Sequence, residues 1–412
     1  MPGVNGLQPI RLDSSLPDAR WTHAPGPPVM WLTCDAGTLR STLRAHGGRV
    51  IREWDDPLTA LAWMSDMSDI PDTRARWIGY LSYDLGRLFE RLPTRAQDDL
   101  RLPLFSFTMH YAFADPPAYV LRALPISTGL QPTIQSNFTR PAYHAAVARC
   151  IDYIAAGDVF QVNLSQRFSV GMSATPAQVY ARLVEHTPAW YGALLQYPDH
   201  ALVCNSPETF LRVVPQPDGR RTVITRPIKG TRPRLPGMEN ALRDSIKDQA
   251  ELNMIVDLER NDLGRVCEIG SVRVTRPREI ETHPTVYHGA ATVEGTLRPG
   301  VGFVDLLRAT FPGGSITGAP KIRAMEIIDE LEPSRRGPYC GAIGYLEPDG
   351  AMEFNIAIRT MIIKEGIAHI PVGGGIVADS NPADEYEETL VKARAMLAAL
   401  GVKLDDLRER ER

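Results

Sequence analysis

The feature that most constrains the fold is a series of closely spaced strands between Cys340 and Gly375. The sequence there is CGAIGYLEPDGAMEFNIAIRTMIIKEGIAHIPVGGG, in which apolar runs are separated by Pro-Asp-Gly and Lys-Glu-Gly. Both triplets are typical of tight turns between antiparallel strands. We therefore expect three strands joined as hairpins in an antiparallel sheet.

Helices are expected on both sides of this stretch. Apolar residues recur at helical spacing in RPAYHAAVARCIDYIAAGD, which begins at Arg140, and Thr175 followed by Pro176 has the form of a helix start. Further helices are predicted over about 238–259, 302–309, 320–331 and 382–400.

Strands are predicted between the helices. Apolar runs with proline-marked turns fill about 31–125, FQVNLSQRF alternates as a strand does, and 189–225 reads as a β-meander interrupted by YPDH and QPDG. Runs of strands that alternate with runs of helices, without strict βαβ repetition, indicate an α+β protein with antiparallel sheets.

Composition limits the classes of function. The chain has 412 residues, a formal charge of −4 and a pI near 6.2, which gives no electrostatic case for nucleic-acid binding. Its five cysteines are far apart, odd in number and without a CxxC pair, which argues against a disulfide framework and for a reducing cytoplasm. Without an N-terminal apolar segment or a run of 18 apolar residues, a soluble protein that is not exported is expected.

Two acidic pairs lie on predicted helices. Asp248 and Glu251 are three residues apart, as are Glu385 and Glu388, so each pair shares one helix face. Lys392 continues the second face one turn later. A solvated acidic face is the common explanation for one such pair, but two pairs can converge on a cation. Oxygen ligands without histidine or cysteine would select Mg²⁺.

The stretch TRPIKGTRPR, from Thr225 to Arg234, places Lys229 among three arginines, two prolines and a glycine. Each proline fixes its own φ and the glycine permits a turn, so the lysine is expected to be held in a defined place. Neighbouring positive charge also favours the neutral amine, which is the nucleophilic form. The alternative is an ordinary exposed lysine.

Further features are candidates for a substrate site. FPGGSITGAPK, from Phe311 to Lys321, leads into a helix and offers backbone N–H groups to an anion. Arg359, inside an apolar strand, suits a substrate carboxylate, although a wet sheet face would also explain it. Glu208, if buried, would favour its protonated form and could act as a general acid. The glycines that begin at Gly373 suit close approach of a substrate to the backbone.

Several other chemistries are not supported. FPGGSITGAPK is not a P-loop, because Ala319 and Pro320 separate the last glycine from the lysine. The run GGGIVA resembles a dinucleotide fingerprint only loosely. The nine histidines show no metal-binding spacing, and no GxSxG is present.

Eight motifs, taken in order, resemble the chorismate-utilising enzymes over about residues 140–400, and WIGYLSYDLGR extends the likeness weakly upstream. The motifs are FQVNLSQ, NSPETF, PIKGTRPR, MIVDLERNDLGRV, FPGGSITGAPKIRAMEIIDELEP, GAIGY, IAIRT and GGGIVADS. The resemblance implies an α+β fold in which antiparallel sheets form a central sandwich flanked by helices. It further implies a strand-rich region over 1–140 that packs on a catalytic core over 141–412, as one globular unit, with a Mg²⁺-dependent site in the central cleft.

Within this family, lysine at the position of Lys229 is typical of the aminodeoxychorismate enzymes, whereas anthranilate, isochorismate and salicylate synthases typically have alanine there. The resemblance implies that the Lys229 amine attacks C2 of chorismate while Glu208 protonates the departing C4 hydroxyl. Ammonia then enters at C4 and expels the lysine, which gives 4-amino-4-deoxychorismate, the precursor of 4-aminobenzoate and folate. Gln161 stands where water-using members have a lysine, which argues against water as the nucleophile.

The resemblance also assigns the other site residues. Glu251 and Glu388 match the Mg²⁺ ligands of the family, and Asp248 and Glu385 match acidic positions around them. Substrate-binding positions are matched by Arg359, Tyr339, the backbone of Gly373, Gly374 and Gly375, and Lys392, and more loosely by Ser315 and His288. The family's tryptophan-sensing Leu-Leu-Glu-Ser motif is not found in the N-terminal region, where WLTCDAGTLRS occurs instead.

A partner is expected to supply the nitrogen. No glutaminase segment is apparent in the chain, so ammonia is predicted to come from a separate glutamine amidotransferase subunit, with free ammonia able to serve at high concentration. One alternative is anthranilate synthase component I, which additionally eliminates pyruvate. A second is a catalytically silent subunit that binds chorismate or an amino acid. Lys229 argues against both, because neither needs a nucleophilic side chain.

Overall fold

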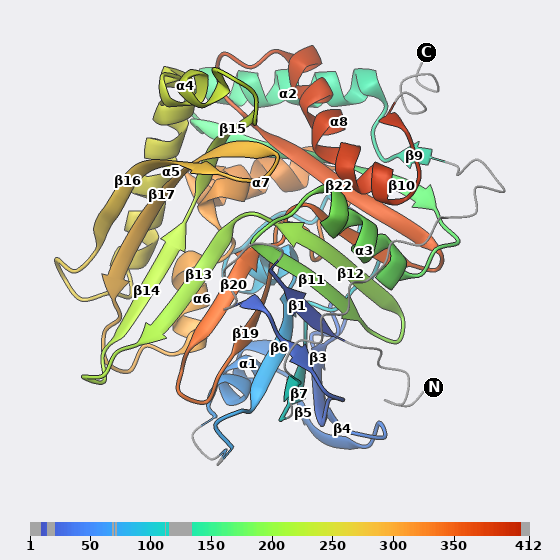
Figure 1. Cartoon of the computed structure of the whole chain (residues 1–412), viewed down its shortest axis with the longest axis vertical. Coiled ribbons are helices and arrows are strands. Elements are labelled where there is room, and N and C mark those ends of the chain that lie inside the picture. The colour runs from blue at the N-terminus through green and yellow to red at the C-terminus, as the bar shows by residue number, and fades with distance from the viewer. Residues whose placement is uncertain are drawn as a thin grey trace.

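The computed structural model describes residues 10–14, 21–67, 70, 72–111, 113–114 and 134–404. Two large sheets form the centre of this part of the chain (Figure 1). The first sheet has eight strands, in the order β1 (Arg11–Asp13), β11 (Tyr191–Gln196), β12 (His200–Ser206), β21 (Thr360–Lys364), β22 (Ile367–Ile376), β10 (Gln161–Gly171) and β18 (Gly318–Ala319), with β9 (Ile134–Ser136) also paired to β10.

The second sheet has twelve strands and reaches across the whole molecule. Its order is β15 (Ile228–Pro233), β17 (Val286–Thr296), β14 (Arg221–Arg226), β13 (Thr209–Pro215), β20 (Met352–Ile356), β19 (Ala342–Leu346), β6 (Arg76–Leu81), β7 (Phe105–His110), β3 (Met30–Cys34), β4 (Ser41–Ala45) and β5 (Val50–Trp54), with β16 (Arg273–Thr282) also paired to β17. A separate short pair joins β2 (Ala24–Pro25) to β8 (Phe113–Ala114). Neighbouring strands in both large sheets run antiparallel.

The two sheets face one another over a shared apolar core. Ile78 and Ile343 from the twelve-stranded sheet belong to the same buried cluster as Leu195, Leu202 and Ile362 from the eight-stranded sheet. Each sheet therefore packs one face into a central sandwich. The sequence predicted this arrangement for an α+β protein with antiparallel sheets. The prediction of the fold class is confirmed.

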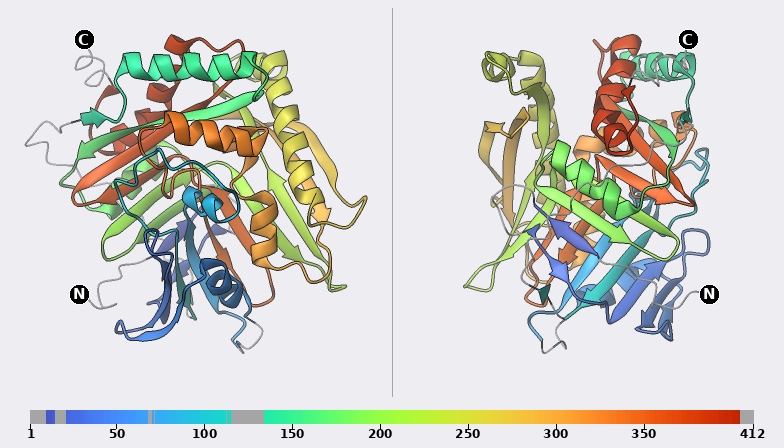
Figure 2. Two further views of the ribbon diagram at one scale, coloured as in Figure 1. Left: turned by 180° about the vertical axis from the view of Figure 1, so that it is seen from behind. Right: turned by 45° about the vertical axis from the view of Figure 1, so that its right-hand side comes forward.

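Helices cover the outer faces of the sandwich. The described helices are α1 (Pro57–Ser65), α2 (Arg140–Ala155), α3 (Pro176–His186), α4 (Met238–Arg243), α5 (Ile246–Gly264), α6 (Phe303–Thr310), α7 (Lys321–Leu331) and α8 (Pro382–Ala399). Residues of α2, α3, α7 and α8 share one core with the eight-stranded sheet, and residues of α1, α5 and α6 share another with the twelve-stranded sheet. The right-hand view of Figure 2 shows α4 and β16–β17 on one side of the upper part of the molecule and α8 on the other.

Most predicted helices are confirmed, with caps that explain where they begin. The Thr139 hydroxyl accepts a hydrogen bond from the Ala142 N–H at the start of α2. Thr175 and Gln178 form a reciprocal capping box at the start of α3. The helix expected over 238–259 is interrupted, however, because Ser245 leaves the helical conformation and caps α5, which continues to Gly264.

Helix α1 was not predicted, since the region from 31 to 125 was read as strands only. It begins where Asp56 accepts hydrogen bonds from the N–H groups of Leu58 and Thr59, with Pro57 in the first turn. Leu61 and Met64 are among the residues that anchor it in the core. Its short length left too little periodicity to distinguish it from a strand.

Two strand predictions need correction because the chain crosses between the sheets. The stretch from Cys340 contains four strands rather than three, since residues 357–359 carry the chain from β20 in one sheet to β21 in the other. The predicted meander over 189–225 consists of two hairpins, β11–β12 and β13–β14, that also belong to different sheets. Turn residues predict the hairpins correctly but do not reveal the sheet that each hairpin joins.

The two crossings are hydrogen-bonded to each other. The Ser206 hydroxyl donates to the Ile356 carbonyl oxygen at 2.6 Å, and the Ile356 N–H donates to the Glu208 carbonyl oxygen at 3.0 Å. The Asn205 N–H donates to the Arg359 carbonyl oxygen at 3.1 Å. Glu208 and Arg359 therefore lie at the same junction between the sheets, although 151 residues of sequence separate them.

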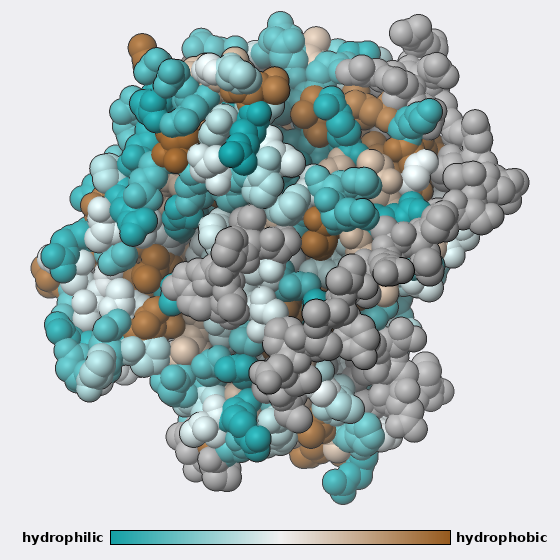
Figure 3. Space-filling view, in the orientation of Figure 1, coloured by the Kyte–Doolittle hydropathy of each residue, from teal (hydrophilic) through white to brown (hydrophobic). Residues whose placement is uncertain are grey.

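Strands from both predicted parts of the chain share the sheets. β3 to β7 extend the twelve-stranded sheet beyond β19, and β1 lies at the edge of the eight-stranded sheet. The boundary near residue 140 stays a prediction. No helix in the described ranges is both long and apolar enough to cross a membrane. On the face seen in Figure 3, exposed apolar residues of the described segments form small separate patches on a largely hydrophilic surface.

Two glycines lie at the centre of the twelve-stranded sheet, where neighbouring phenylalanine rings and backbone atoms leave no room for a side chain. Gly79 of β6 is paired with Gly344 of β19 and with Phe107 of β7. A Cβ on Gly79 would lie 2.7 Å from Phe107 Cδ1 and 2.0 Å from the Ser106 carbonyl oxygen. The glycines in WIGYL and GAIGY thus leave room for neighbouring rings and backbone.

We predict that Gly79→Ala lowers the free energy of unfolding by at least about 2 kcal/mol, because the new methyl group overlaps backbone atoms that cannot move independently. Gly171→Ala is the matched control, since a Cβ at Gly171 meets nothing within 4 Å. We expect that control to change stability by no more than about 0.5 kcal/mol. Denaturant unfolding of both variants measures the difference, and equal stabilities would contradict the prediction.

Candidate active site

Lys229 lies at a β-bulge in strand β15. Ile228 pairs with Ala290 of β17 and Thr231 pairs with His288, so Lys229 and the following glycine face one residue of the partner strand. The predicted defined placement of the lysine therefore has a structural basis, but in a bulged strand rather than a stiff loop. A bulge turns a side chain out of the regular ladder and aims it elsewhere.

Two glycines make this bulge possible. Gly230 has a φ of +80°, and a Cβ there would lie 2.8 Å from Asp248 Cγ. On the facing strand, a Cβ on Gly289 would lie 2.6 Å from the Lys229 carbonyl oxygen. Sequence reasoning missed Gly289, although a glycine inside the strand VYHGAAT is itself a sign of close backbone approach.

Burial is the main reason why the pKa of Lys229 is lowered from its ordinary value, and the charge of Lys392 lowers it further. The carboxylates of Glu251, Glu208 and Glu388 act in the opposite direction. The sequence predicted a lowered pKa for Lys229 and attributed it to the neighbouring arginines. The lowered pKa is found, but burial and Lys392 cause it, not the arginines.

Two of those three arginines are paired with carboxylates instead. Arg232 forms an ion pair with Asp248 at 2.7 Å, and Arg226 is paired with Glu281. Each guanidinium charge is thus balanced locally. What remains around the Lys229 amine is a low-dielectric site with acidic walls.

Glu208 forms the floor of the site next to Lys229. It lies directly before β13, at the junction of the sheets, and is 5% exposed. Burial raises the pKa of its carboxyl group, while Ser315, Lys229 and the Ile228 N–H favour the charged form. Ser315 lies beside the carboxyl group, although its buried Oγ has no well-formed hydrogen bond. Burial thus favours a neutral amine on Lys229 and a neutral acid on Glu208.

Helix α8 contributes the second acidic pair. Glu385 accepts a hydrogen bond from the Ser380 hydroxyl at 2.6 Å, and Glu388 forms an ion pair with Lys392 at 2.6 Å. All three side chains of the predicted stripe lie against Gly374. A Cβ on that glycine would lie 3.2 Å from Glu385 Oε2, 3.6 Å from Glu388 Oε1 and 3.8 Å from Lys392 Nζ.

Acidic groups of α5 face those of α8. Burial raises the pKa of Glu251, and the charges of Asp248 and Glu388 raise it further. Burial likewise raises the pKa of Glu385, with a contribution from Glu388. The carboxylates of the two helices therefore repel one another across the site. A cation between them would relieve this repulsion.

The acidic side chains of the site can supply only part of the coordination shell of Mg²⁺. In the ranges that the structure describes, no three histidine, cysteine or acidic side chains lie close enough to hold a metal ion by themselves. Mg²⁺ is commonly held by one or two carboxylates together with water and substrate oxygens. Glu251 and Glu388, one from each helix, are suited to such a site.

The predicted substrate-binding residues lie around the same centre. Lys392 Nζ donates to the Gly373 carbonyl oxygen at 2.8 Å, and Arg359 Nη1 donates to the Lys392 carbonyl oxygen at 3.1 Å. Arg359 has a φ of 52°, an uncommon value for a residue with a side chain. Tyr339 is 4% exposed and interacts electrostatically with Arg359.

Two further predicted substrate-binding residues are His288 and Gly375. His288 Nδ1 is 2.9 Å from the Thr231 hydroxyl oxygen, and burial lowers the pKa of His288 to about 3, with help from His283 and Arg359. It is therefore neutral at physiological pH. Gly375 faces Gln161, whose fully buried side-chain amide has no hydrogen-bond partner. An orphaned buried amide is costly and indicates a place for a polar ligand.

Exposure shows which end of the site is open. The side chain of Glu388 is 51% exposed, that of Lys392 is 30% exposed and that of Glu251 is 19% exposed. Glu208 and Ser315, at 5% and 4%, are almost fully enclosed. A substrate would therefore enter between α5 and α8 and reach Lys229 and Glu208 last.

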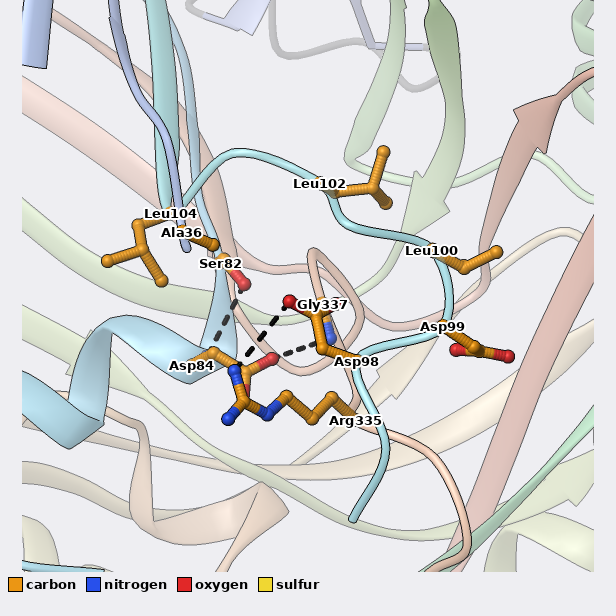
Figure 4. A pocket seen from close by; sticks show the side chains of 10 residues that line it. All are labelled: Ala36, Ser82, Asp84, Asp98, Asp99, Leu100, Leu102, Leu104, Arg335 and Gly337. Carbon is orange, nitrogen blue, oxygen red and sulfur yellow. Dashed lines mark hydrogen bonds and ion pairs between the residues drawn. The ribbon is translucent and has the colours of Figure 1, made fainter. Parts of the chain in front are cut away.

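The cavity in Figure 4 is a separate feature. It has a volume of about 10 Å³ and lies where Asp84 accepts a hydrogen bond from the Gly337 N–H at 3.0 Å. Its lining residues are Ala36, Ser82, Asp84, Asp98, Asp99, Leu100, Leu102, Leu104, Arg335 and Gly337. None of them is a predicted site residue. The space suits one water molecule rather than a substrate.

A family model described as chorismate binding enzyme matches residues 121–398. This range contains every predicted site residue. The chain belongs to this family. The sequence resemblance is thereby confirmed, and the matched range begins somewhat before the expected residue 140.

Relatives of two kinds are similar to this family member. It is 42% identical to anthranilate synthase component 1 of Thermus thermophilus, over 86% of this chain and 84% of that one. It is 40% identical to aminodeoxychorismate synthase component 1 of Escherichia coli, over 84% and 83% of the two chains. The corresponding Bacillus subtilis protein is 38% identical over 89% and 86%. Overall identity does not decide between these activities.

A solved structure confirms the fold. The crystal structure of anthranilate synthase component I from Streptococcus pneumoniae matches with a TM-score of 0.77 and 31% identity, over 94% of this chain and 92% of that one. The menaquinone-specific isochorismate synthase of Escherichia coli has a TM-score of 0.66 at 17% identity, which supports the fold alone.

We predict that Gly230→Ala lowers kcat for chorismate turnover by about tenfold to a hundredfold, because the side chain opposes the bulge that aims Lys229. Gly237→Ala is the matched control. Gly237 also has a φ of +80°, but a Cβ there meets nothing within 4 Å. In both variants an alanine must adopt a left-handed backbone conformation, but only Gly230→Ala is expected to displace Lys229.

Steady-state kinetics of both variants, with thermal unfolding as a check on folding, measures this effect. An equal loss of activity in the two variants would show that the backbone conformation matters and the bulge contact does not.

Proposed function

We propose that the chain is the chorismate-converting component of an aminodeoxychorismate synthase, which forms 4-amino-4-deoxychorismate from chorismate and ammonia for 4-aminobenzoate and folate synthesis. The observation that carries this proposal is the Lys229 amine, which a bulge aims into a buried site beside Glu208. Binding alone needs no such amine. A nucleophile of lowered pKa next to a neutral acid suits covalent substitution.

In the first proposed step the neutral Lys229 amine attacks C2 of the chorismate ring. Glu208 donates its proton to the C4 hydroxyl, which leaves as water, and both ring double bonds shift as the bond to C2 forms and the bond from C4 to oxygen breaks. Both groups enter this step in the protonation state that burial favours. Proton donation of this kind typically contributes about 10²–10⁴-fold to a rate.

In the second proposed step ammonia attacks C4 and the lysine amine leaves from C2. The nitrogen thereby occupies the position of the departed hydroxyl. His288 is neutral and Arg359 lies next to Tyr339, so these residues are suited to hold the substrate carboxylates and hydroxyl groups rather than to exchange protons. The orphaned amide of Gln161 is available to hydrogen-bond a small polar reactant.

Glu251 and Glu388 would hold Mg²⁺, with Asp248 and Glu385 around them. When bound, the ion would supply positive charge for the ring carboxylate of chorismate. Without that charge the substrate would approach carboxylates directly, and a like-charge pair at about 4 Å costs on the order of 4 kcal/mol at an effective dielectric of 20. Lys392 already offsets part of the charge of Glu388.

We further propose that a glutamine amidotransferase subunit supplies the ammonia. The relatives of both activities are named component 1, which supports a two-subunit arrangement. The five cysteines are all buried and unpaired, which suits the reducing cytoplasm where such a complex would work.

The second candidate is anthranilate synthase component I, and the Thermus thermophilus relative favours it. The two reactions share loss of the C4 hydroxyl and differ in where nitrogen enters and in pyruvate elimination. The shared loss of the C4 hydroxyl would depend on Glu208 and on the predicted metal ligands. The difference depends on the residue at position 229, and lysine there favours the first candidate.

We predict that chorismate, ammonium and Mg²⁺ incubated with the purified chain give 4-amino-4-deoxychorismate, identified by chromatography and mass. Removing Mg²⁺ with a chelator should abolish turnover, and glutamine should not replace ammonium unless a partner subunit is added. Fluorescent anthranilate with pyruvate would instead establish the second candidate. Tight chorismate binding without any product would identify a silent binding subunit.

We predict a covalent intermediate when ammonia is withheld. With chorismate and Mg²⁺, the intact mass of the chain should rise by one chorismate less one water, because nothing is present to expel the lysine. Lys229→Ala should abolish the increase. Lys247→Ala is the matched control, since Lys247 lies 4.0 Å from Glu251 but its side chain is 61% exposed.

Peptide mapping of the adduct tests the assignment directly. An adduct on a residue other than Lys229, or an undiminished adduct in Lys229→Ala, would remove this lysine from the proposed role.

A further inference from the structure

One edge of strand β10 is closed by an ion pair over part of its length. On the side away from β22, β10 pairs with β18 at residues 161–162 and with β9 at residues 168–170. Over residues 163–165, no described strand pairs with that edge. Buried backbone N–H and C=O groups without partners are costly, so this gap needs hydrogen bonds from elsewhere in the fold.

Arg336 and Glu332 supply those hydrogen bonds. Arg336 Nη2 donates to the Asn163 carbonyl oxygen at 2.6 Å, and the Ser165 N–H donates to Glu332 Oε1 at 2.8 Å. Arg336 also donates to Glu332 twice, from Nε to Oε2 at 3.0 Å and from Nη2 to Oε1 at 2.7 Å. Their side chains are 2% and 3% exposed, so the ion pair is buried. The proposed mechanism uses neither residue.

The same guanidinium group holds the turn that contains Ser315. Arg336 Nη1 donates to the Ile316 carbonyl oxygen at 2.8 Å. Ile316 ends the 3₁₀ turn Gly314–Ile316, which we call the Ser315 turn. The Asn163 N–H also donates, at 2.8 Å, to the carbonyl oxygen of the residue that follows this turn. Arg336 therefore joins the Ser315 turn to β10, with one terminal nitrogen on each.

The position of Ser315 depends on this anchor because its own side chain does not fix it. Ser315 lies beside the Glu208 carboxyl group, and its buried Oγ has no well-formed hydrogen bond. Its place next to the acid is thus determined by the backbone of the turn. That backbone is held to the rest of the site through Arg336 and β10.

A guanidinium group suits this task better than an ammonium group. Its planar fork donates in fixed directions, so Nη1 and Nη2 can bind two carbonyl oxygens at once. The guanidinium carbon of Arg336 lies 4.7 Å from the centre of the Tyr83 ring, and Glu332 binds two of its nitrogens, so the fork is held in one orientation. A buried ion pair is weak evidence for stability, because desolvation opposes the attraction between the charges. Its fixed geometry indicates a role in positioning.

We propose that Arg336, held by Glu332, is a positioning residue that keeps Ser315 beside Glu208. This inference rests on the proposed function only in that Glu208 acts on the bound substrate. Ser315 then offers a hydroxyl group without a partner where Glu208 protonates the leaving group. Misplacement of a group in an active site by about 1 Å can cost about a hundredfold in rate, so loss of the anchor lowers kcat.

The first test compares Arg336→Lys with wild type by the rate of chorismate consumption. Lysine keeps the positive charge beside Glu332 but cannot bind both carbonyl oxygens. We expect kcat to fall by about tenfold to a hundredfold, and KM to change by less than about threefold because Lys392 is held from β22 instead. Arg323→Lys is the matched control and should keep the wild-type kcat. Arg323 also pairs with a glutamate of α7 and lies over a tyrosine ring, but its side chain is 34% exposed.

A double-mutant cycle with Ser315→Ala shows whether Arg336 acts through Ser315. If it does, Arg336→Lys should lower kcat by less than about threefold in a chain that already lacks the hydroxyl group. Multiplication of the two single losses would overturn the proposal and indicate a structural role alone.

Glu332→Asp is the second variant, and it withdraws the carboxylate by one methylene group. It should show the same pattern in the cycle if Arg336→Lys does not fold. Failure of both variants to fold would also overturn the proposal.

Amide hydrogen exchange tests the positioning without turnover. In Arg336→Lys, exchange should become at least about tenfold faster over residues 163–165 and 314–317, while other segments of the core keep their wild-type rates. Unchanged exchange in those two segments, or equal acceleration throughout the core, would contradict the inference. Chorismate consumption is measured whichever product forms, and product identity tests the proposed function separately. A wild-type chain that consumed no chorismate would refute the proposed function, and the exchange rates would then decide this inference.

Discussion

The site depends on one construction, the hydrogen-bonded junction at which the chain twice leaves one sheet for the other. The Ser206 hydroxyl and the Ile356 N–H join the crossing before β13 to the crossing after β20. Because both crossings are tied together, Glu208 and Arg359 lie at one place in the molecule. Lys392 connects Lys229 of β15 with the glycine backbone of β22, because its charge acts on the Lys229 amine and its Nζ donates to the Gly373 carbonyl oxygen.

Burial at that junction determines the chemistry that the side chains favour. In water a lysine is charged and a glutamic acid is ionised, which is the wrong state for a nucleophile and for a proton donor. Enclosure shifts the pKa values of Lys229 and Glu208 in opposite directions, each toward the neutral form. Glu388 of α8 lies nearer the solvent and is paired with Lys392, which favours its charged form and keeps it available for a cation. Distance from the mouth thus separates neutral reactants from charged binding groups.

Sequence patterns predicted those features of the fold that depend on residues close together in the chain. Turn triplets, caps and apolar spacing located most helices and hairpins, and the motif order identified the family. Three features required knowledge of contacts between distant segments: the crossing at 357–359, the cap at Ser245 that divides a helix, and the bulge opposite Gly289. The cause of the shift in Lys229 was missed for the same reason, since arginines adjacent in sequence are paired with acids brought from elsewhere in the fold.

The near-equal identity to two enzyme types has a physical explanation in this architecture. The range that matches the family model contains the junction and the acidic residues of α5 and α8, and every reaction that begins by binding chorismate and releasing its hydroxyl group needs those parts. The route after that step depends on which nucleophile reaches the ring first. In the proposed mechanism, an amine fixed to the protein at C2 blocks that carbon and leaves C4 to ammonia, whereas a small side chain at the same position would leave C2 open. One residue on a bulge can therefore divide a family whose scaffold stays the same.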